Sequence, residues 1–378
     1  MFKKTIATLV AVTVIFGGAM STPAMAAPGK DLRILPVIVN GQKAKFPDTE
    51  PYINTDGRTM VPVRFVSEML GAEVKWEIDT QTAIVLYDGK TIRMPIGSKT
   101  ITVDGTKQEL DTAAEFAEGR TMVPLRFVSE VLGSEVEWDN AAHAVKVTDA
   151  EYQAKVDAGT VKLDSWGREY SKTFDANWMK LTDLESTNFY TGFKNWKGSR
   201  SYLETARDWD YKEFADQWAQ HIRNYYEVQL NFDYRTVNSK SFADTLVANM
   251  GGMTDNREYP TRNIMAQYVE FAKKNKVVTK GYADPELSSA FYGGGFVWVP
   301  THFKFMIVSA TDSAQTFVDN YDVSTGSDSP ELKKGVWYDG YALIRMYTNY
   351  GNMEHKFYGV YDMENMFMKG NYFYDIQE

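Results

Sequence analysis

The feature that most constrains this chain is an internal repeat with an offset of 62 residues. The segment GRTMVPVRFVSEMLGAEVKW (residues 57–76) recurs as GRTMVPLRFVSEVLGSEVEW (residues 119–138), and sixteen of the twenty positions are identical. Self-similarity at a fixed offset indicates that one supersecondary unit is built twice. We therefore expect residues 34–148 to form a module of two repeats, at about 34–95 and 96–148.

Each copy carries the signals of a short helix between strands. A proline fits the first helical turn and a glycine the C-cap, with apolar residues at helical spacing between them; these positions are Pro62, Gly71, Pro124 and Gly133. Alternating strands follow, so each repeat is predicted to be β-β-α-β-β, an antiparallel sheet around a helix. We expect Trp76 and Trp138 to pack in the core at the helix–strand corner.

Two further local signals recur. Asn40-Gly41 and Asp104-Gly105 precede the two copies and predict two-residue hairpin turns, which require left-handed backbone angles. Arg64 and Glu68 stand four residues apart on the expected helix and should form a surface ion pair.

The motif G-R-T-M-V-P-[VL]-R-F-V-S-E-x-L-G-x-E-V-x-W resembles the copper amine oxidase N-terminal domain-like, or stalk, family. The resemblance covers about residues 34–148, close to a third of the chain. It implies an antiparallel sheet curled around a helix that lies outside the oxidase catalytic domain and carries no active site. It also implies an accessory module of a secreted or wall-associated protein of the Gram-positive type.

The remaining residues do not fit an amine oxidase. That activity needs a tyrosine in a T-x-x-N-Y-[DE] motif and a copper held by three histidines, two of them as H-x-H. Residues 320–322 read Asn-Tyr-Asp, but Phe317 stands where the threonine should be. The four histidines are isolated in the sequence: His143, His221, His302 and His355. We expect no copper, no other metal site and no cofactor.

Residues 1–26 have the pattern of a signal peptide. Lysines at positions 3 and 4 precede an apolar run at 6–19, and Ala-Met-Ala at 24–26 is typical of a cleavage site. The apolar run is shorter than the roughly 20 residues that span a bilayer. We therefore expect a secreted protein, extracellular or cell-wall associated, with no membrane span after cleavage.

Composition narrows the partners. The chain has 41 Lys plus Arg against 50 Asp plus Glu, and the net charge of −9 argues against a nucleic-acid partner. The chain has no cysteine, which excludes disulfide frameworks, thiol nucleophiles and a lipid anchor on cysteine.

The C-terminal region is built on a different plan. After a polar linker at 149–160, in part helical, the chain becomes rich in aromatic residues, with 7 Trp, 21 Tyr and 15 Phe from residue 150 onward. Helical periodicity is followed by strand alternation, which predicts an α+β domain with an antiparallel sheet over 161–378. The helices are expected at about 211–226, 241–250 and 261–274, and the strands at 277–282, 296–299, 302–309, 335–347 and 356–361.

Two functions remain open for this region. The first is a non-enzymatic binding or structural protein of the cell envelope, whose partner is a cell-wall polymer or another envelope protein. Exposed aromatic rings suit such contacts, and the candidate ligand-contact residues are Trp196, Trp209, Trp298 and Trp337. The alternative is a hydrolase of cell-wall glycan or peptide that uses two carboxylates. No catalytic residue is assigned, because acid pairs arise by chance in so acidic a region.

Overall fold

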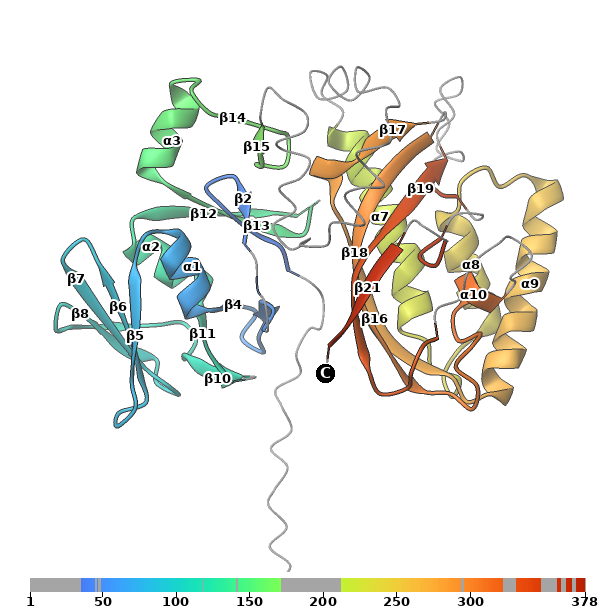
Figure 1. The fold of residues 1–378 in the computed structure, drawn as a ribbon, viewed down its shortest axis with the longest axis horizontal. Helices are drawn as coiled ribbons and strands as arrows, with labels where there is room; N and C mark the ends of the chain where they lie inside the picture. The colour runs from blue at the N-terminus through green and yellow to red at the C-terminus, as the bar shows by residue number, and fades with distance from the viewer. Residues whose placement is uncertain are drawn as a thin grey trace, which may run out of the picture.

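The computed structural model describes eleven stretches of the chain, and buried apolar side chains within them form two large clusters. The described residues are 35–44, 46, 49–117, 119–140, 142–170, 212–293, 296–321, 331–347, 359–361, 365–368 and 372–377, with the first two stretches separated by one residue. One large cluster lies within residues 37–147 and the other within 215–367. We call 35–149 the N-terminal module and 212–377 the C-terminal domain (Figure 1).

The N-terminal module is rich in short strands and has two short helices that pack against each other. Its elements are β1 Val37–Val39, β2 Gln42–Lys43, β3 Tyr52–Ile53, β4 Thr59–Pro62, α1 Val63–Met69, β5 Glu73–Glu77, β6 Thr82–Tyr87, β7 Lys90–Pro95, β8 Thr100–Val103, β9 Thr106–Glu109, β10 Glu115–Ala117, β11 Arg120–Pro124, α2 Leu125–Val131, β12 Ser134–Asp139 and β13 Ala144–Asp149. They form sheets in the orders β12-β13-β1-β2, β10-β11-β4-β3 and β5-β6-β7-β8-β9.

The two copies of the repeated segment face each other through β4 and β11. Val61 pairs with Val123, which is its own equivalent in the other copy, and the strands run antiparallel. This register relates the copies by a local two-fold axis. The leading hairpin of each copy then joins the other copy: β1-β2 extends the β12-β13 sheet, and β8-β9 extends the β5-β6-β7 sheet.

This exchange differs from the expected self-contained antiparallel repeats. The pairing of β1 with β13 is parallel, with Val37 opposite Val145. No hairpin fixes the relative direction of two strands so far apart in sequence. The turns, by contrast, are confirmed: Asn40 and Gly41 have φ of 48° and 71°, and Asp104 and Gly105 have 49° and 79°. Both residues of each turn are left-handed, as a type I′ hairpin requires.

Helix α3 (Ala150–Asp157) and the hairpin β14 (Lys162–Leu163) and β15 (Glu169–Tyr170) connect the two parts. Asp149 caps α3 by accepting a hydrogen bond from the Tyr152 N–H at 2.7 Å, and it also bonds the Asn40 side chain at 2.6 Å. The Glu169 N–H donates to the Gly41 carbonyl at 2.8 Å. The connection is therefore held against the first hairpin of the module.

The C-terminal domain is α+β, with helices first and an antiparallel sheet after them. Its elements are α7 Lys212–Leu230, α8 Ser239–Asn249, α9 Asp255–Lys274, β16 Val278–Pro285, the 3₁₀ helix η1 Leu287–Ser289, β17 Phe291–Gly293, β18 Phe296–Ser309, α10 Val318–Tyr321, β19 Trp337–Tyr347, β20 Gly359–Val360 and β21 Tyr372–Gln377. Strand β18 lies between β16 and β19, β17 also pairs with β18, and β20 and β21 pair with β19.

One face of this sheet carries the large core. Phe303, Phe305 and Ile307 alternate along β18, are fully buried and face the helices. The Tyr226 ring of α7 meets the Phe303 ring edge-on, with centroids 4.8 Å apart. Figure 1 shows α7, α8 and α9 on this side of the sheet and the N-terminal module on the other side.

Two elements run further than the sequence indicated. Helix α9 begins at Asp255 and contains Pro260, although proline removes one helical hydrogen bond and the helix was expected to begin after it, at about residue 261. Strand β18 continues through Pro300, which pairs with Leu343 of β19.

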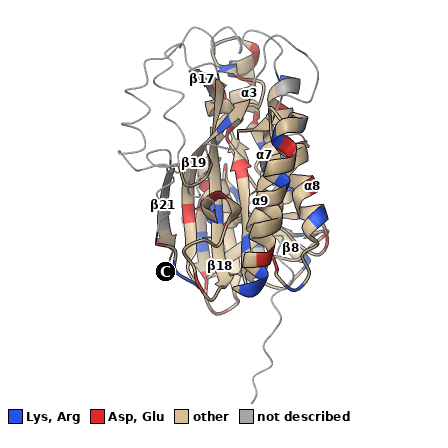
Figure 2. Ribbon diagram, turned by 90° about the vertical axis from the view of Figure 1, so that its right-hand side faces the viewer, with Lys and Arg blue, Asp and Glu red and all other residues tan. Residues whose placement is uncertain are grey.

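The helical side of the molecule carries charges of both signs along α8 and α9 (Figure 2). Within the described residues, no helix is long and apolar enough to cross a bilayer.

Candidate functional site

The second face of the C-terminal sheet carries charged residues and is covered by the N-terminal module. His302 and Lys304 of β18 alternate with the core-facing phenylalanines, and β19 places Tyr341 and Asp339 opposite them. Strand alternation predicts that such a polar face meets solvent. Here His302 is only 6% exposed and Tyr341 only 2%.

Five charged side chains from four elements form what we call the ion cluster, at one end of this face. Lys43 of β2 forms an ion pair with Glu286 and lies 3.9 Å from Asp284. Arg168, in the β14–β15 turn, is 3.4 Å from Glu286. Arg223 of α7 is 3.5 Å from Asp284. Each of these five side chains is at most 15% exposed, so the module, the connecting hairpin and the C-terminal domain meet through buried charges.

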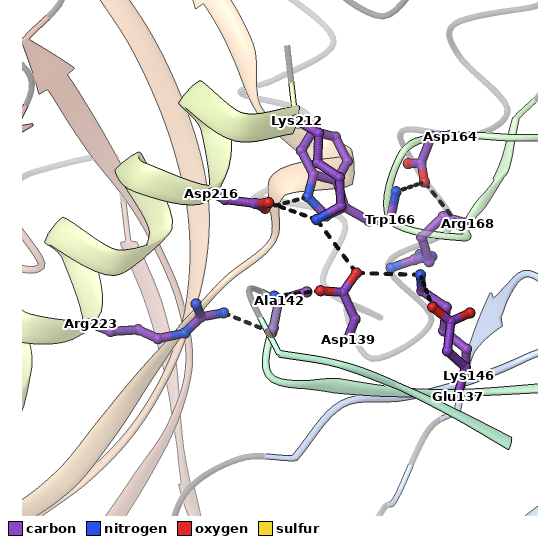
Figure 3. Close-up of polar contacts among 10 residues, drawn as sticks. All are labelled: Glu137, Asp139, Ala142, Lys146, Asp164, Trp166, Arg168, Lys212, Asp216 and Arg223. Carbon is purple, nitrogen blue, oxygen red and sulfur yellow. Dashed lines mark hydrogen bonds and ion pairs between the residues drawn. The ribbon is translucent and has the colours of Figure 1, made fainter. Parts of the chain in front are cut away.

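A second charged group, centred on Asp139 at the end of β12, lies beside the ion cluster (Figure 3). Lys146 of the module and Lys212 of α7 approach its carboxylate at 3.3 and 3.5 Å. Burial raises the pKa of Asp139, but the Ala142 N–H and the two lysines outweigh that effect and hold the pKa below its ordinary value. Arg223 also donates a hydrogen bond to the Ala142 carbonyl at 2.9 Å, so two residues of α7, Lys212 and Arg223, contact this turn.

The connecting hairpin contributes an aromatic contact that sequence reasoning missed. The Trp166 indole N–H donates to Asp216 of α7 at 2.9 Å (Figure 3). The Asp164 carboxylate shapes the turn by accepting the N–H groups of Trp166 and Arg168 at 2.9 and 2.8 Å. An aspartate two residues before a Trp-Gly pair is an available turn signal, but it does not reveal what the tryptophan contacts.

A third group gathers near the middle of the covered face. The His302 Nε2 lies 2.6 Å from Asp339 Oδ1, and the imidazole stacks on Tyr341 with centroids 4.8 Å apart. Lys304 is 3.8 Å from the other oxygen of Asp339. Glu50 of the module interacts electrostatically with His302, Lys304 and Asp339, and burial raises the pKa of its carboxyl.

A small cavity remains beside the ion cluster. Its volume is about 40 Å³, and charged and apolar side chains of the module, the hairpin and the β16–η1 corner line it. A water molecule needs roughly 10–15 Å³ of such volume, so this cavity has room for a few waters and is too small for a sugar ring. The arrangement therefore joins two parts of the chain, and its carboxylates are each held by cations.

Comparison with known proteins identifies one of these parts. Residues 38–147 match the family model of the copper amine oxidase N-terminal domain. The N-terminal module is a copper amine oxidase N-terminal domain. A "Protease inhibitor" from Brevibacillus choshinensis is 30% identical over 143 residues, which are 38% of this chain and 43% of that protein. The chain thus matches less than half the length of this relative. No solved structure is significantly similar to the chain.

The residues tested for oxidase chemistry have other roles. Tyr321, in the partial tyrosine motif, is partly buried and packs its ring against the core, 5.5 Å from Tyr268 and 5.1 Å from Phe271. His355 lies outside the described residues. Among those that the structure describes, no three or more His, Asp or Glu side chains lie close enough together to hold a metal.

The four candidate ligand-contact tryptophans do not form one described site. Trp196 and Trp209 lie outside the described residues. Trp298 is 9% exposed and lies 5.4 Å below the Arg345 guanidinium. Trp337 pairs with Met306, eight residues further along β18 than Trp298. At about 3.3 Å per residue the backbone positions of the two tryptophans are roughly 26 Å apart along the strand direction.

The prediction that the repeated tryptophans pack in the core is wrong. In the copper amine oxidase N-terminal domain, Trp76 and Trp138 each keep 40% of their surface exposed. They lie on β5 and β12, which are edge strands of their sheets. Burying these tryptophans would require another segment of the chain beside the open edge of each sheet. No such segment lies there among the described residues. The predicted ion pair of Arg64 with Glu68 is confirmed at 3.8 Å.

Proposed function

We propose that this chain is a secreted, non-enzymatic protein of the cell envelope. In it, the copper amine oxidase N-terminal domain holds the C-terminal domain in a fixed orientation for binding to cell-wall polymer. The signal-peptide pattern of residues 1–26 supports export, and the family of the N-terminal module supports a structural rather than catalytic role for that part.

The ion cluster is the observation that carries this proposal. Removing a charge from water costs several kcal/mol. The attraction to its partner offsets that cost only when the geometry of the pair is good. Lys43, Arg168 and Glu286 reach that geometry only when the module, the hairpin and the sheet are docked together. A flexible tether between independent domains has no need of such contacts. The cluster therefore favours a rigid support over a loose linker.

A sedimentation assay tests the wall-binding role. Purified protein beginning at Ala27 is mixed with peptidoglycan sacculi, and the pellet and the soluble fraction are both analysed. Retention in the pellet without released glycan or peptide supports the proposal. Released fragments that disappear on substitution of one Asp or Glu would establish the hydrolase alternative instead. No retention would remove the wall from the function.

A second candidate function, inhibition of an extracellular protease, is favoured by the similarity to the Brevibacillus protein. Inhibitors that mimic substrate offer an extended segment with an exposed side chain. Strand β10 has this form, because it is the outer strand of its sheet and its Phe116 is 63% exposed. A phenylalanine suits proteases with a hydrophobic specificity slot, such as chymotrypsin.

Titration of chymotrypsin with the purified protein tests this second function. Stoichiometric inhibition that Phe116→Asp abolishes would support it. Tyr259→Ala is the matched control, because Tyr259 is 79% exposed but lies on helix α9, where the backbone cannot enter a protease cleft as a strand. Ordinary cleavage of the chain, or equal inhibition by both variants, would exclude Phe116 as the contact.

A further inference from the structure

Trp76 and Trp138 present the same side chain to solvent in the two copies of the repeat. Each keeps 40% of its surface exposed, and they lie on β5 and β12, which are outer strands of two different sheets. No other tryptophan in the described part of the chain is as exposed. The exposed indole is therefore a property of the repeated unit and not of one copy alone.

The strand register places each indole at the margin of the module's core. Side chains two residues apart on a strand share a face, so Trp76 lies on the same face as Val74, and Ala83 stands opposite it on β6. Val74 packs against the core and Ala83 is buried. Val136 and Val145 hold these two places in the second copy. Each indole thus continues an apolar face beyond the core, and its remaining surface is open to solvent.

The charges next to the two tryptophans are already paired. The charged residues that directly precede and follow each tryptophan have an oppositely charged partner no more than 3.9 Å away; the pairs are Lys75–Glu73, Glu77–Arg93, Glu137–Lys146 and Asp139–Lys146. Strand alternation also directs these residues to the face opposite the indole. A polyanion needs cations on the surface that it contacts, so the indole faces favour an uncharged ligand.

The exposed area at each position is small. It is roughly 100 Å², taking about 250 Å² for a whole tryptophan, whereas a stable protein interface buries about 800 Å² on each partner. Ile78 enlarges the apolar surface of the first copy, but Asn140 stands at the equivalent position of the second. Among the described residues, the indole is the one large exposed apolar group that both copies share. A ligand common to both copies therefore needs only a ring face to contact.

Hydrogen-bonding groups stand at the rim of the Trp138 ring. Asn140 Oδ1 lies 3.5 Å from the indole Nε1, and the His143 ring meets the indole edge-on with centroids 6.1 Å apart. The first copy has Gln81 at the position of His143, and both residues have a left-handed backbone, with φ of 46° and 51°. A sugar ring has C–H groups on its faces and hydroxyls around them, so it suits an aromatic face with polar groups at its edge.

We propose that Trp76 and Trp138 are two equivalent stacking sites for an uncharged glycan strand of the cell wall. This inference rests on the proposed wall-binding function and assigns part of the binding to the N-terminal module itself. A polymer offers the same sugar face many times, and two sites on one chain turn the second contact into an intramolecular step that strengthens retention.

Fluorine NMR tests the two sites directly. The full mature chain is labelled with fluorotryptophan, which gives a separate signal for each of its nine tryptophans. Trp76→Leu and Trp138→Leu identify the two signals by their loss. We expect these two signals to shift saturably when the uncharged hexamer of N-acetylglucosamine is added to the unsubstituted protein. Polyglycerol phosphate, a polyanion, should leave both signals in place.

Sedimentation with peptidoglycan sacculi measures what the sites contribute to retention. Each single leucine variant should be retained at least about tenfold more weakly than the unsubstituted chain, because one of two linked contacts is lost. Leucine keeps an apolar contact at the core margin, and thermal unfolding checks that each variant is folded. Ile78→Ser is the matched control: Ile78 is 77% exposed on the turn that follows β5, and its loss should leave retention unchanged.

The outcomes separate this inference from the function on which it rests. Unshifted signals, together with full retention of the double leucine variant on sacculi, would overturn the stacking sites and leave wall binding to the C-terminal domain. Shifted signals without retention of the unsubstituted chain on sacculi would overturn the wall-binding function and with it the assigned source of the glycan.

Three further results would overturn the stacking sites. Equal loss of retention in Ile78→Ser would show that a general apolar patch, and not the ring, makes the contact. Equal shifts with polyglycerol phosphate would contradict an uncharged ligand. Self-association that the leucine variants abolish, measured by sedimentation velocity, would show that a second copy of the chain covers the indoles.

Discussion

Lys43 and Glu286 form a buried ion pair between side chains that stand 243 positions apart in the sequence. Lys43 is 5% exposed and Glu286 6%, and the pair joins the first hairpin of the copper amine oxidase N-terminal domain to the C-terminal sheet. Arg168 binds the same glutamate from the connecting hairpin. One carboxylate thus holds three parts of the chain, which makes it the sharpest place to test their coupling.

Substitution of this carboxylate should destabilise the whole molecule. Glu286→Gln leaves Lys43 and Arg168 buried without their shared counter-charge, and breaking a buried pair from one side costs about 3–5 kcal/mol. Denaturant unfolding measures the loss. Calorimetry of the variant should also separate one transition into two, because the module and the C-terminal domain have separate cores and lose the contact that makes them unfold together.

The matched control is the exposed pair of the module. Arg64 and Glu68 are 3.8 Å apart with both side chains about half exposed, so Glu68→Gln should cost no more than about 1 kcal/mol. If Glu286→Gln is as mild as Glu68→Gln, the ion cluster does not couple the two parts.

Asp139 gives a prediction for the acid side of the pH range. Its pKa is held below the ordinary value by the Ala142 N–H, Lys146 and Lys212 despite burial. A lowered pKa in the folded state contributes stability that is present above the ordinary carboxyl range and is lost as pH falls through the lowered pKa. The difference in free energy of unfolding between the unsubstituted protein and Asp139→Asn should therefore be largest near neutral pH and vanish in acid.

Glu137→Gln is the control for this profile. Glu137 is 3.9 Å from the same Lys146 but is 72% exposed, so its removal should leave the pH profile unchanged. Comparing variants with the unsubstituted protein cancels the titration of Glu50, whose raised pKa acts in the opposite direction. Equal profiles for Asp139→Asn and Glu137→Gln would contradict the assigned role of Asp139.

Two local features of the fold could be predicted from the sequence. The left-handed turn at Asn40-Gly41 was predictable because two adjacent residues determine it. The buried face of β18 was predictable from the alternation of Phe303, Phe305 and Ile307. In both cases the residues that decide the structure are neighbours along the chain.

The interface between the N-terminal module and the C-terminal sheet could not be predicted from the sequence, for a physical reason. His302 and Lys304 have the pattern of a solvent-facing strand face, and the residues that interact with them include Glu50 of the module, more than 240 positions earlier in the chain. The exposure of Trp76 likewise depends on strand order, since β5 lies at the edge of its sheet. Strand order across an exchanged repeat is a long-range property that periodicity does not contain.

Gly281 of β16 offers a test of the sheet itself. A methyl group added there would lie 2.6 Å from the Lys304 carbonyl oxygen and 2.7 Å from Phe305 Cβ, on the neighbouring strand. Asn231 also bonds the Gly281 carbonyl at 2.8 Å, which limits how far the strand can shift. Gly281→Ala should therefore cost about 1–3 kcal/mol by overpacking, measured by thermal unfolding. Lys280→Ala, at an exposed position of the same strand, should stay within about 0.5 kcal/mol, and equal costs for the two would contradict the close approach.

Asp319 is a buried carboxylate that accepts several hydrogen bonds inside the C-terminal core. Its carboxylate accepts hydrogen bonds from Gln229 at 2.9 Å, Tyr226 at 3.0 Å, Tyr225 at 3.3 Å and the Met366 N–H at 3.2 Å. Each buried donor left without a partner costs about 1–3 kcal/mol. Asp319→Ala should therefore lower the free energy of unfolding by at least about 3 kcal/mol.

Asp319→Asn separates the hydrogen bonds from the charge. Burial raises the pKa of Asp319 although the donated hydrogen bonds lower it, so the folded protein keeps the proton above the ordinary carboxyl range. The resulting stability is present below the ordinary carboxyl pKa and is lost as pH rises through the raised pKa. The asparagine cannot titrate, so the variant should lose this part of the pH dependence while retaining more stability than the alanine. Unfolding curves between about pH 4 and pH 8 measure both effects, and an asparagine variant with the unchanged pH slope would show that Asp319 stays ionised in the core.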